Sequence, residues 1–214
     1  MTKSRDPAPP PLWCYDFISP FSYLLLEQHD NWPEVPFELM PVSLYGLYRH
    51  WGQRPGYEVP QRRIFTFRYA LFRAEQLGIP FKMPPAHPFD STKALLLATA
   101  ARADVACTRA IFRFIWREGR DPSTDEGFAD LCRYAGVPDG ERLIALEETK
   151  AQLQRNGEEA IRIGIFGVPT FRFNDQLFWG EDALPMVLYC ARTPNWLESK
   201  EVKRISKLPL GVVP

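Results

Sequence analysis

The feature that most constrains the fold is a pair of X-Pro dipeptides placed far apart in the chain, each where an apolar run meets a turn. Ser19-Pro20 follows the apolar residues 12–17, and Val168-Pro169 precedes another apolar run. Proline suits the first turn of a helix, because an N–H would have no helical partner there. Proline also begins edge strands and occupies turns with a cis peptide bond. If the fold brings the two segments together, a hydroxyl at a helix N-terminus faces a proline loop.

Charge balance and hydropathy argue against two broad classes of protein, dedicated nucleic-acid binders and membrane-spanning proteins. The 214 residues suit one compact domain, or one domain that carries a large insertion. Lys+Arg and Asp+Glu are equal at 26 each, whereas a dedicated nucleic-acid binder needs a concentrated basic surface. No apolar run approaches the roughly 20 residues that span a bilayer. Residues 1–11 are polar and proline-rich without a signal-peptide pattern, so we expect a disordered leader and a cytoplasmic protein.

The cysteines indicate no redox pair and no metal site. Cys14, Cys107, Cys132 and Cys190 are widely spaced, and none belongs to a C-x-x-C motif. A thioredoxin-type dithiol and a zinc ribbon both need that spacing. We therefore expect all four cysteines to be buried apolar residues.

The N-terminal part of the chain predicts a βαβ unit. Residues 12–17 are rich in aromatic side chains and end at a turn signal, which is typical of a strand. Residues 20–28 predict a helix with Pro20 in its first turn, and residues 36–40 predict a second strand between two prolines.

The middle of the chain, residues 43–164, predicts helices only. Residues 62–76 carry apolar side chains at helical spacing and stop at Gly78-Ile79-Pro80. The other helices expected there cover residues 93–102, 104–118, 124–136 and 138–154, the last as one helix or two.

Strand signals return at residues 168–173, followed by an Asn174-Asp175 turn, a pairing strand at 176–179 and a helix at 182–192. The order βαβ, helices, ββα predicts an α/β thioredoxin-like fold with an inserted all-helical domain. The boundaries that we expect are a leader at 1–11, a thioredoxin-like domain at 12–42 and 165–193, the insert at 43–164 and a loosely packed tail at 194–214.

Ser19 has two interpretations. Serine before proline is a common helix cap, and local sequence alone favours that role. The catalytic hypothesis uses the same position, because a helix N-terminus stabilises a thiolate or carboxylate held there. The serine hydroxyl would donate a hydrogen bond to a bound thiolate and lower the pKa of that thiol. Ser22, one turn later, is interpreted as structural.

Two further segments suggest a peptide-binding site. Pro169 either starts an edge strand or follows a cis bond, and a cis bond would leave the Val168 backbone free to pair with an extended peptide. Asp182 suits a helix cap, and Gly180 with Glu181 and Asp182 also suits a backbone nest for an amino-acid end, the two roles being compatible.

Other candidate contacts are less specific. Lys82, His87 and Phe89 lie in an extended proline-rich segment, where a lone histidine is more often a turn residue than a catalytic one. Phe21 follows the Ser19-Pro20 pair and is taken as a substrate contact. Gln53 is taken as a contact to the bound peptide.

Several motifs together resemble one family. Residues 16–24 look like the opening motif of the 2-hydroxychromene-2-carboxylate isomerases, which are relatives of kappa-class glutathione transferases in the DsbA-like thioredoxin superfamily. Residues 164–171 resemble the family's cis-proline segment, and residues 178–182 resemble its glutathione motif. Residues 87–90 and 116–121 also look like family landmarks.

The resemblance implies a glutathione-dependent isomerase, usually a homodimer, that acts on a small aromatic carboxylate in bacterial breakdown of naphthalene-type compounds. Glutathione is then a catalytic cofactor: Ser19 poises its thiol, Val168 and Pro169 hold its cysteinyl backbone, and Gly180, Glu181 and Asp182 hold its γ-glutamyl end. The family often has asparagine where this chain has Gln53 and Asp90.

Three alternatives stay open at this point. A kappa-like glutathione transferase or peroxidase would consume glutathione. A binding protein that has lost the chemistry would keep the fold. A dithiol oxidoreductase is disfavoured, because Ser19 and Ser22 occupy the two positions of a C-x-x-C motif.

Overall fold

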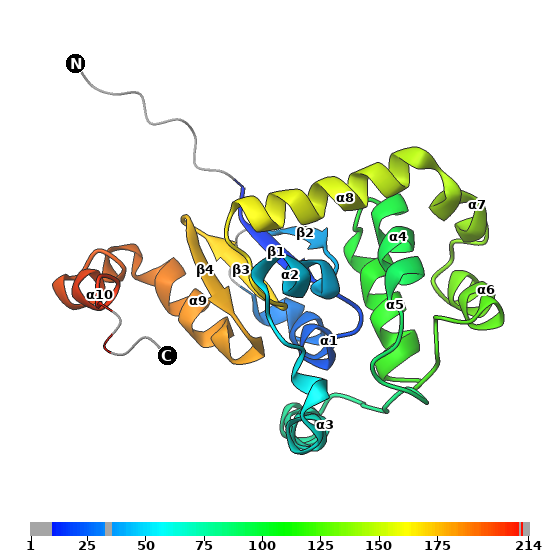
Figure 1. Ribbon diagram of the computed structural model, residues 1–214, viewed down its shortest axis with the longest axis horizontal. Helices are drawn as coiled ribbons and strands as arrows, with labels where there is room; N and C mark the ends of the chain where they lie inside the picture. The colour runs from blue at the N-terminus through cyan, green and yellow to red at the C-terminus, as the bar shows by residue number, and fades with distance from the viewer. Residues whose placement is uncertain (1–9, 33–35, 210, 212–214) are drawn as a thin grey trace.

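The sheet has four strands in the order β2-β1-β3-β4 (Figure 1). The computed structural model describes residues 10–32, 36–209 and 211. The strands are β1 (Leu12–Tyr15), β2 (Glu38–Pro41), β3 (Thr170–Phe173) and β4 (Gln176–Trp179). β1 pairs parallel with β2 and antiparallel with β3, and β3 pairs antiparallel with β4. The predicted βαβ and ββα halves are therefore confirmed and share one sheet.

The five segments between β2 and β3 that were predicted to be helical all contain helices, with shifted ends, whereas the helix at residues 44–51 was not among the predictions. The α-helices are α1 (Pro20–Glu27), α2 (Leu44–Trp51), α3 (Pro60–Leu77), α4 (Thr92–Ala100), α5 (Val105–Trp116), α6 (Asp125–Tyr134), α7 (Gly140–Ala145), α8 (Glu147–Arg162), α9 (Leu184–Arg192) and α10 (Lys200–Ile205). The short 3-10 helices are η1 (His29–Asn31), η2 (Gly56–Glu58), η3 (Glu181–Ala183) and η4 (Pro194–Trp196). The predicted segment 138–154 forms two helices, and the second runs on to Arg162.

Helices cover both faces of the sheet. Trp13 and Tyr15 of β1 belong to a large buried cluster with α1, α5 and α9. Leu12 and Cys14 of the same strand belong to a smaller cluster with α2 and α8. Since successive side chains of a strand point to opposite faces, both faces of β1 are buried. This explains why the strand reads as a continuous apolar run.

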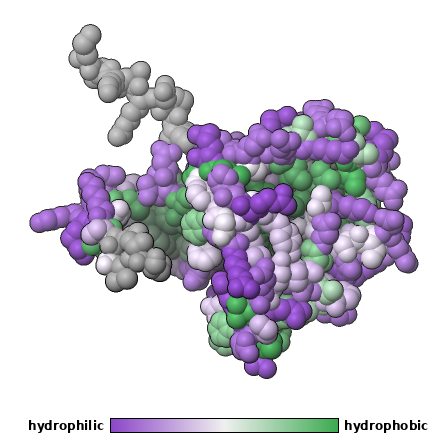
Figure 2. Space-filling view, in the orientation of Figure 1, coloured by the Kyte–Doolittle hydropathy of each residue, from purple (hydrophilic) through white to green (hydrophobic). Residues whose placement is uncertain are grey.

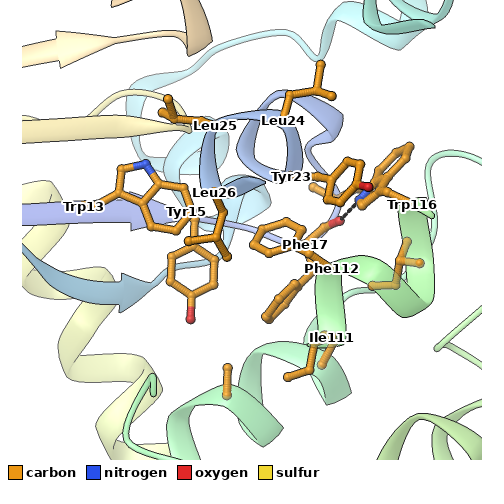
Figure 3. Packing of buried hydrophobic residues seen from close by; sticks show 14 of the residues in the cluster. Trp13, Tyr15, Phe17, Tyr23, Leu24, Leu25, Leu26, Ile111, Phe112 and Trp116 are labelled. Atoms are coloured by element: carbon orange, nitrogen blue, oxygen red, sulfur yellow. Dashed lines mark hydrogen bonds between the residues drawn. The ribbon is translucent and has the colours of Figure 1, made fainter. Parts of the chain in front are cut away.

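Aromatic rings join the sheet to the helices that follow β2 (Figure 3). The rings of Phe17 and Phe112 lie 4.5 Å apart, and those of Trp13 and Tyr15 stack at 4.8 Å. Trp116 Nε1 of α5 donates a 2.8 Å hydrogen bond to the Phe17 carbonyl, just before the turn that starts α1. Because one cluster spans both parts, the division into two domains stays a prediction.

Helix α3 exposes its large apolar side chains and buries small ones, the opposite of what its apolar periodicity suggests. Its buried residues are Ala70 and Ala74, whereas the apolar side chains that mark its periodicity are largely exposed. These exposed side chains, together called the α3 apolar face, are Ile64, Phe65, Leu71 and Phe72. In Figure 2 hydrophobic side chains gather over α3 at the bottom of the view. Small side chains let α3 lie close to α1, and the larger ones point outward.

The structure describes most of the C-terminal segment but little of the N-terminal one. The predicted leader at 1–11 lies outside the described residues except for its last two positions. The predicted tail is less loose than expected, because it forms η4 and α10, and Trp196 and Leu197 pack against the core. Within the described part of the chain, no helix is long and apolar enough to cross a membrane.

Candidate active site

Ser19 lies in the turn between β1 and α1 and caps the helix. Its Oγ accepts a 3.2 Å hydrogen bond from the Ser22 N–H, so the predicted capping role is confirmed. The side chain still has its hydroxyl hydrogen to donate. Ser19 is 6% exposed and lines a cavity, which is the placement that a hydrogen bond to a bound ligand requires.

Asp16 orders this turn from beneath. Its buried carboxylate accepts the Ile18 N–H at 3.1 Å and the Leu44 N–H at 2.8 Å, and the Ser91 side chain adds a third hydrogen bond. Burial raises the pKa of Asp16, while these hydrogen bonds oppose the rise. The carboxylate thus joins the Ser19 turn to the first residue of α2. Sequence reasoning missed this role, although an aspartate two residues before a turn N–H is a known turn signal.

The Val168–Pro169 bond is cis, as one of the two interpretations of this pair predicted. Thr170 Oγ1 donates to the Gly167 carbonyl at 2.7 Å, and the Gly180 N–H donates to the Pro169 carbonyl at 3.0 Å. Among the described residues, the N–H and C=O of Val168 have no backbone partner. An extended peptide can pair with such groups.

Gly167 serves the site in a different way from the one expected. A Cβ at this position would lie 2.8 Å from Nε1 of Trp179, so the indole packs directly on the glycine. It is therefore Trp179, rather than a ligand, whose close approach requires glycine here.

Two cavities meet at Phe21, Val168 and Trp179. The first, called the tyrosine cavity, measures about 200 Å³. The second, called the Gly180 cavity, measures about 320 Å³. Residues that line the tyrosine cavity include Ser19, Tyr45, Tyr48, Tyr57, Arg62 and His87. Residues that line the Gly180 cavity include Tyr69, Pro169, Gly180, Glu181 and Asp182. Phe21, Val168 and Trp179 line both, so a ligand in one cavity lies next to a ligand in the other. Larger cavities of about 520 and 610 Å³ lie elsewhere and include none of these residues.

Glu181 is engaged by the protein itself. Its carboxylate is buried and accepts two hydrogen bonds from Arg73, at 2.8 and 3.1 Å, and one from Gln28 Nε2 at 3.2 Å. The side chain therefore ties η3 to α3 and α1. Its predicted contact to a glutathione end stays a prediction, although the residue lines the Gly180 cavity.

Asp182 is exposed and lines the same cavity. The predicted capping role of Asp182 is wrong, because the residue lies inside η3 and α9 begins two residues later after Ala183. Because the 3-10 helix η3 precedes α9, Ala183 occupies the N-cap position of α9 and Asp182 does not. Its carboxylate is left at the cavity wall.

His87 is held against the Ser19 turn. Its Nε2 lies 2.9 Å from the Ile18 carbonyl oxygen, and burial lowers the pKa of the ring. A neutral ring that donates from Nε2 satisfies that carbonyl, and Nδ1 is buried without a partner among the described residues. The His87–Pro88 bond is also cis, which was not expected from the sequence.

The predicted substrate contacts divide into two groups. Phe21 and His87 line the tyrosine cavity, as expected. The other two predicted substrate contacts, Lys82 and Phe89, and the predicted glutathione contact, Gln53, are not among the described residues that line either cavity, so the structure does not bring them to the site. Lys82 is exposed beside Gly119, and Phe89 is buried against Trp116. Their position in the chain, next to His87, carried no information on which way each side chain points.

The cysteines take no part in the site. All four are free, three are buried and Cys107 is half-buried. Burial raises the pKa of the Cys107 thiol to about 11 and also raises the pKa of Cys14, Cys132 and Cys190. Thiols with raised pKa values are poor nucleophiles near neutral pH.

Comparisons with known proteins agree with this geometry. The family model described as a DSBA-like thioredoxin domain matches residues 13–190. Glutathione S-transferase kappa 2 of Caenorhabditis elegans is 28% identical over 201 residues, which cover 81% of this chain and 87% of the relative. The 2-hydroxychromene-2-carboxylate isomerase of Sphingobium xenophagum is 28% identical over 217 residues, which cover 86% and 95%.

A solved structure has the same fold. A 2-hydroxychromene-2-carboxylate isomerase superimposes with a TM-score of 0.75 at 21% identity, covering 90% of this chain and 98% of that chain. The likeness confirms the thioredoxin-like fold, including the helices between β2 and β3.

Proposed function

The chain belongs to the family of DsbA-like thioredoxin domains, and from that premise we propose that it is a glutathione-dependent isomerase of 2-hydroxychromene-2-carboxylate or a similar intermediate of aromatic breakdown. Its relatives include a kappa-class glutathione transferase and an isomerase of that name. The observation that carries the proposal is the meeting of Ser19, at the start of α1, with the unpaired backbone of Val168, at the cis bond, in one cavity.

The residues present fit an extended thiol-bearing peptide. The Val168 backbone offers one donor and one acceptor to a peptide strand. The N-terminus of α1 carries a partial positive charge, which favours a thiolate beside it. The Gly180 cavity adds the exposed carboxylate of Asp182, which suits an ammonium group.

The roles of the chain's own residues follow from that fit. Ser19 donates its hydroxyl hydrogen to the sulfur and lowers the pKa of the thiol. Val168 fixes the cysteinyl backbone, and Asp182 orients the γ-glutamyl end. The aromatic walls of the tyrosine cavity hold a flat substrate next to Ser19 and exclude water. Glutathione held by these residues would supply a thiolate nucleophile for reversible addition to a conjugated substrate.

A kappa-like glutathione transferase is the second candidate, because the kappa-class relative is as similar as the isomerase, at 28% identity. The two functions share the glutathione site. They differ in the fate of glutathione, which a transferase consumes and an isomerase returns.

A cytoplasmic homodimer completes the proposal. All four cysteines are free, which suits a reducing compartment. The α3 apolar face is the surface that we assign to the dimer contact, because Tyr69 of the same helix lines the Gly180 cavity and a second copy there would flank the site.

The test is a calorimetric titration of the purified protein with glutathione. We expect micromolar to low-millimolar binding to the wild type. We expect Ser19→Ala to keep the fold, at a cost of about 1 kcal/mol for the lost cap, and to lose most activation of the thiol, which is read from the thiolate absorbance of bound glutathione as a function of pH. Ser22→Ala is the matched control, since the Ser22 Oγ makes no hydrogen bond among the described residues.

Two outcomes decide between the candidates. If the wild type binds no glutathione at millimolar concentration, both enzymatic proposals fail and a binding protein with a different ligand remains. If glutathione binds, turnover of 2-hydroxychromene-2-carboxylate with an unchanged amount of free thiol supports the isomerase. Loss of thiol in step with substrate supports the transferase.

A further inference from the structure

We propose that Arg62 binds the anionic group of the ligand in the tyrosine cavity and thereby makes the site selective for planar aromatic acids. The assignment of that ligand as the isomerised substrate rests on the proposed function above. The binding of an aromatic anion does not, because it follows from the residues around the cavity.

The charge of the cavity is the first argument. The described residues that line it include two cations, Arg62 and Arg63, and no aspartate or glutamate. Glu58, the acid nearest to Arg62 in the sequence, pairs with Arg54 at 2.5 Å. A small cavity with an uncompensated positive charge attracts anions.

The two arginines are not equivalent. Arg63 is committed to the protein: it donates to the His87 carbonyl at 3.0 Å, and its guanidinium lies 4.9 Å from the centre of the Phe67 ring. The Arg62 guanidinium has no ion pair and no hydrogen bond within the described chain. Its five N–H donors are therefore available to a carboxylate, which arginine binds in a bidentate manner.

The position of the Arg62 side chain is the second argument. It packs on the glycine of η2, where a Cβ on Gly56 would lie 2.9 Å from Nε and 3.1 Å from Cζ. Its charge also acts on Tyr48, since it opposes the rise of the Tyr48 pKa that burial causes. The guanidinium thus rests on the wall formed by η2 and α2, facing the cavity and not the bulk solvent alone.

The shape of the cavity is the third argument. The rings of Tyr45 and Tyr57 meet edge to face at 6.3 Å beside Arg62, and Phe21 and Trp179 complete an aromatic lining. The volume of about 200 Å³ is below the range of drug-sized sites, which begins near 300 Å³. A flat ligand of one or two rings with a single carboxylate matches this volume and this aromatic lining.

The test compares salicylate with salicylamide, a planar acid and its neutral amide, by calorimetry with and without glutathione. We expect the wild type to prefer the acid. Arg62→Gln should weaken salicylate binding roughly 10- to 100-fold, the usual worth of charge-assisted hydrogen bonds, and leave salicylamide binding unchanged. With 2-hydroxychromene-2-carboxylate as substrate, the same variant should raise KM by a similar factor.

Two further variants separate charge from position. Gly56→Ala keeps the charge but displaces the guanidinium, so it should also weaken salicylate binding. Arg68→Gln removes an exposed charge from the same helix away from the cavity, and should change nothing. Equal binding of the acid and the amide by the wild type, or undiminished salicylate binding by Arg62→Gln, overturns the inference. Failure of glutathione binding instead overturns the proposed function and leaves the salicylate comparison valid.

Discussion

At the scale of single residues, the site depends on the turn between β1 and α1, which hydrogen bonds from three groups hold in place. Ser19 caps α1 on the side of the cavity, and Asp16 ties the same turn to Leu44 and Ser91 on the buried side. His87 forms the third contact, a hydrogen bond to the Ile18 carbonyl. The hydroxyl of Ser19 is thus positioned by groups that themselves touch no ligand, so their loss would misplace it.

Asp16→Asn tests this support. An asparagine has only one acceptor oxygen, so its amide nitrogen would face a backbone N–H or the Ser91 hydroxyl. We expect a loss of about 1–3 kcal/mol in the free energy of unfolding, toward the lower end because the neutral side chain avoids the desolvation that raises the Asp16 pKa. Urea denaturation measures it.

The matched control is Asp90→Asn. Asp90 accepts the Thr92 N–H at 2.9 Å, two residues on, just as Asp16 accepts the Ile18 N–H, but it is exposed. We expect the control to lie within about 0.5 kcal/mol of the wild type. Equal stability of the two variants would show that the Asp16 carboxylate does not support the turn.

At the scale of elements, α3 connects the parts of the site. Arg62, near its N-terminal end, lines the tyrosine cavity, and Tyr69 in its middle lines the Gly180 cavity. Arg73, one turn later, holds Glu181 of η3. In Figure 1 the helix stands at the edge of the molecule, away from the sheet. A single helix therefore carries the walls of both cavities, with few buried residues to hold it in place.

The Arg73–Glu181 pair is expected to hold α3. Arg73→Met would leave a buried carboxylate with Gln28 as its remaining partner. Breaking a buried ion pair costs about 3–5 kcal/mol, and because Arg73 is partly exposed we expect about 2–3 kcal/mol in the free energy of unfolding. Glutathione binding should weaken as well, since η3 lines the Gly180 cavity.

Arg204→Met provides the comparison in a thermal or urea unfolding experiment. Arg204 and Glu201 form an ion pair on α10 at 2.5 Å, and both side chains are exposed. Exposed pairs contribute about 0–1 kcal/mol. If Arg73→Met were no more destabilising than Arg204→Met, the buried pair would not be what anchors α3.

At the scale of the whole molecule, the exposed apolar side chains of α3 are the observation that supports the proposed dimer contact. Phe65 is 65% exposed and Phe72 is 51% exposed on the same helix, where the Phe65 ring stacks on Tyr69 at 5.8 Å. Monomeric proteins rarely leave a contiguous apolar patch of this kind in water. The homodimer proposed above would bury it.

Sedimentation velocity tests the dimer. We expect the wild type to sediment as a dimer and the double variant Phe65→Ser/Phe72→Ser as a monomer, because each aromatic contact at the centre of an interface is worth about 2 kcal/mol or roughly 30-fold in Kd. Leu208→Ser is the control, since Leu208 is 58% exposed in the C-terminal segment. A monomeric wild type, or a double variant that stays dimeric, rules out this surface as the contact.

The sequence by itself determined the order of the strands and of most helices, the capping role of Ser19, and the turn at Asn174 and Asp175. It left two interpretations of Val168-Pro169 open. These features depend on neighbouring residues: proline limits φ, small polar side chains cap helices, and aromatic runs pack as buried strands. Their signals are therefore contained in a few consecutive positions.

Tertiary structure alone decided which side chains meet. The sequence shows that α3 has an apolar side but not that Ala70 and Ala74 face the core while Phe65 faces outward. It suggested Lys82 as a substrate contact and did not indicate that Arg62 lines the tyrosine cavity or that Arg73 holds Glu181. Each of these outcomes depends on contacts between segments far apart in the chain, where packing and burial, and not local conformational preference, determine the lowest free energy.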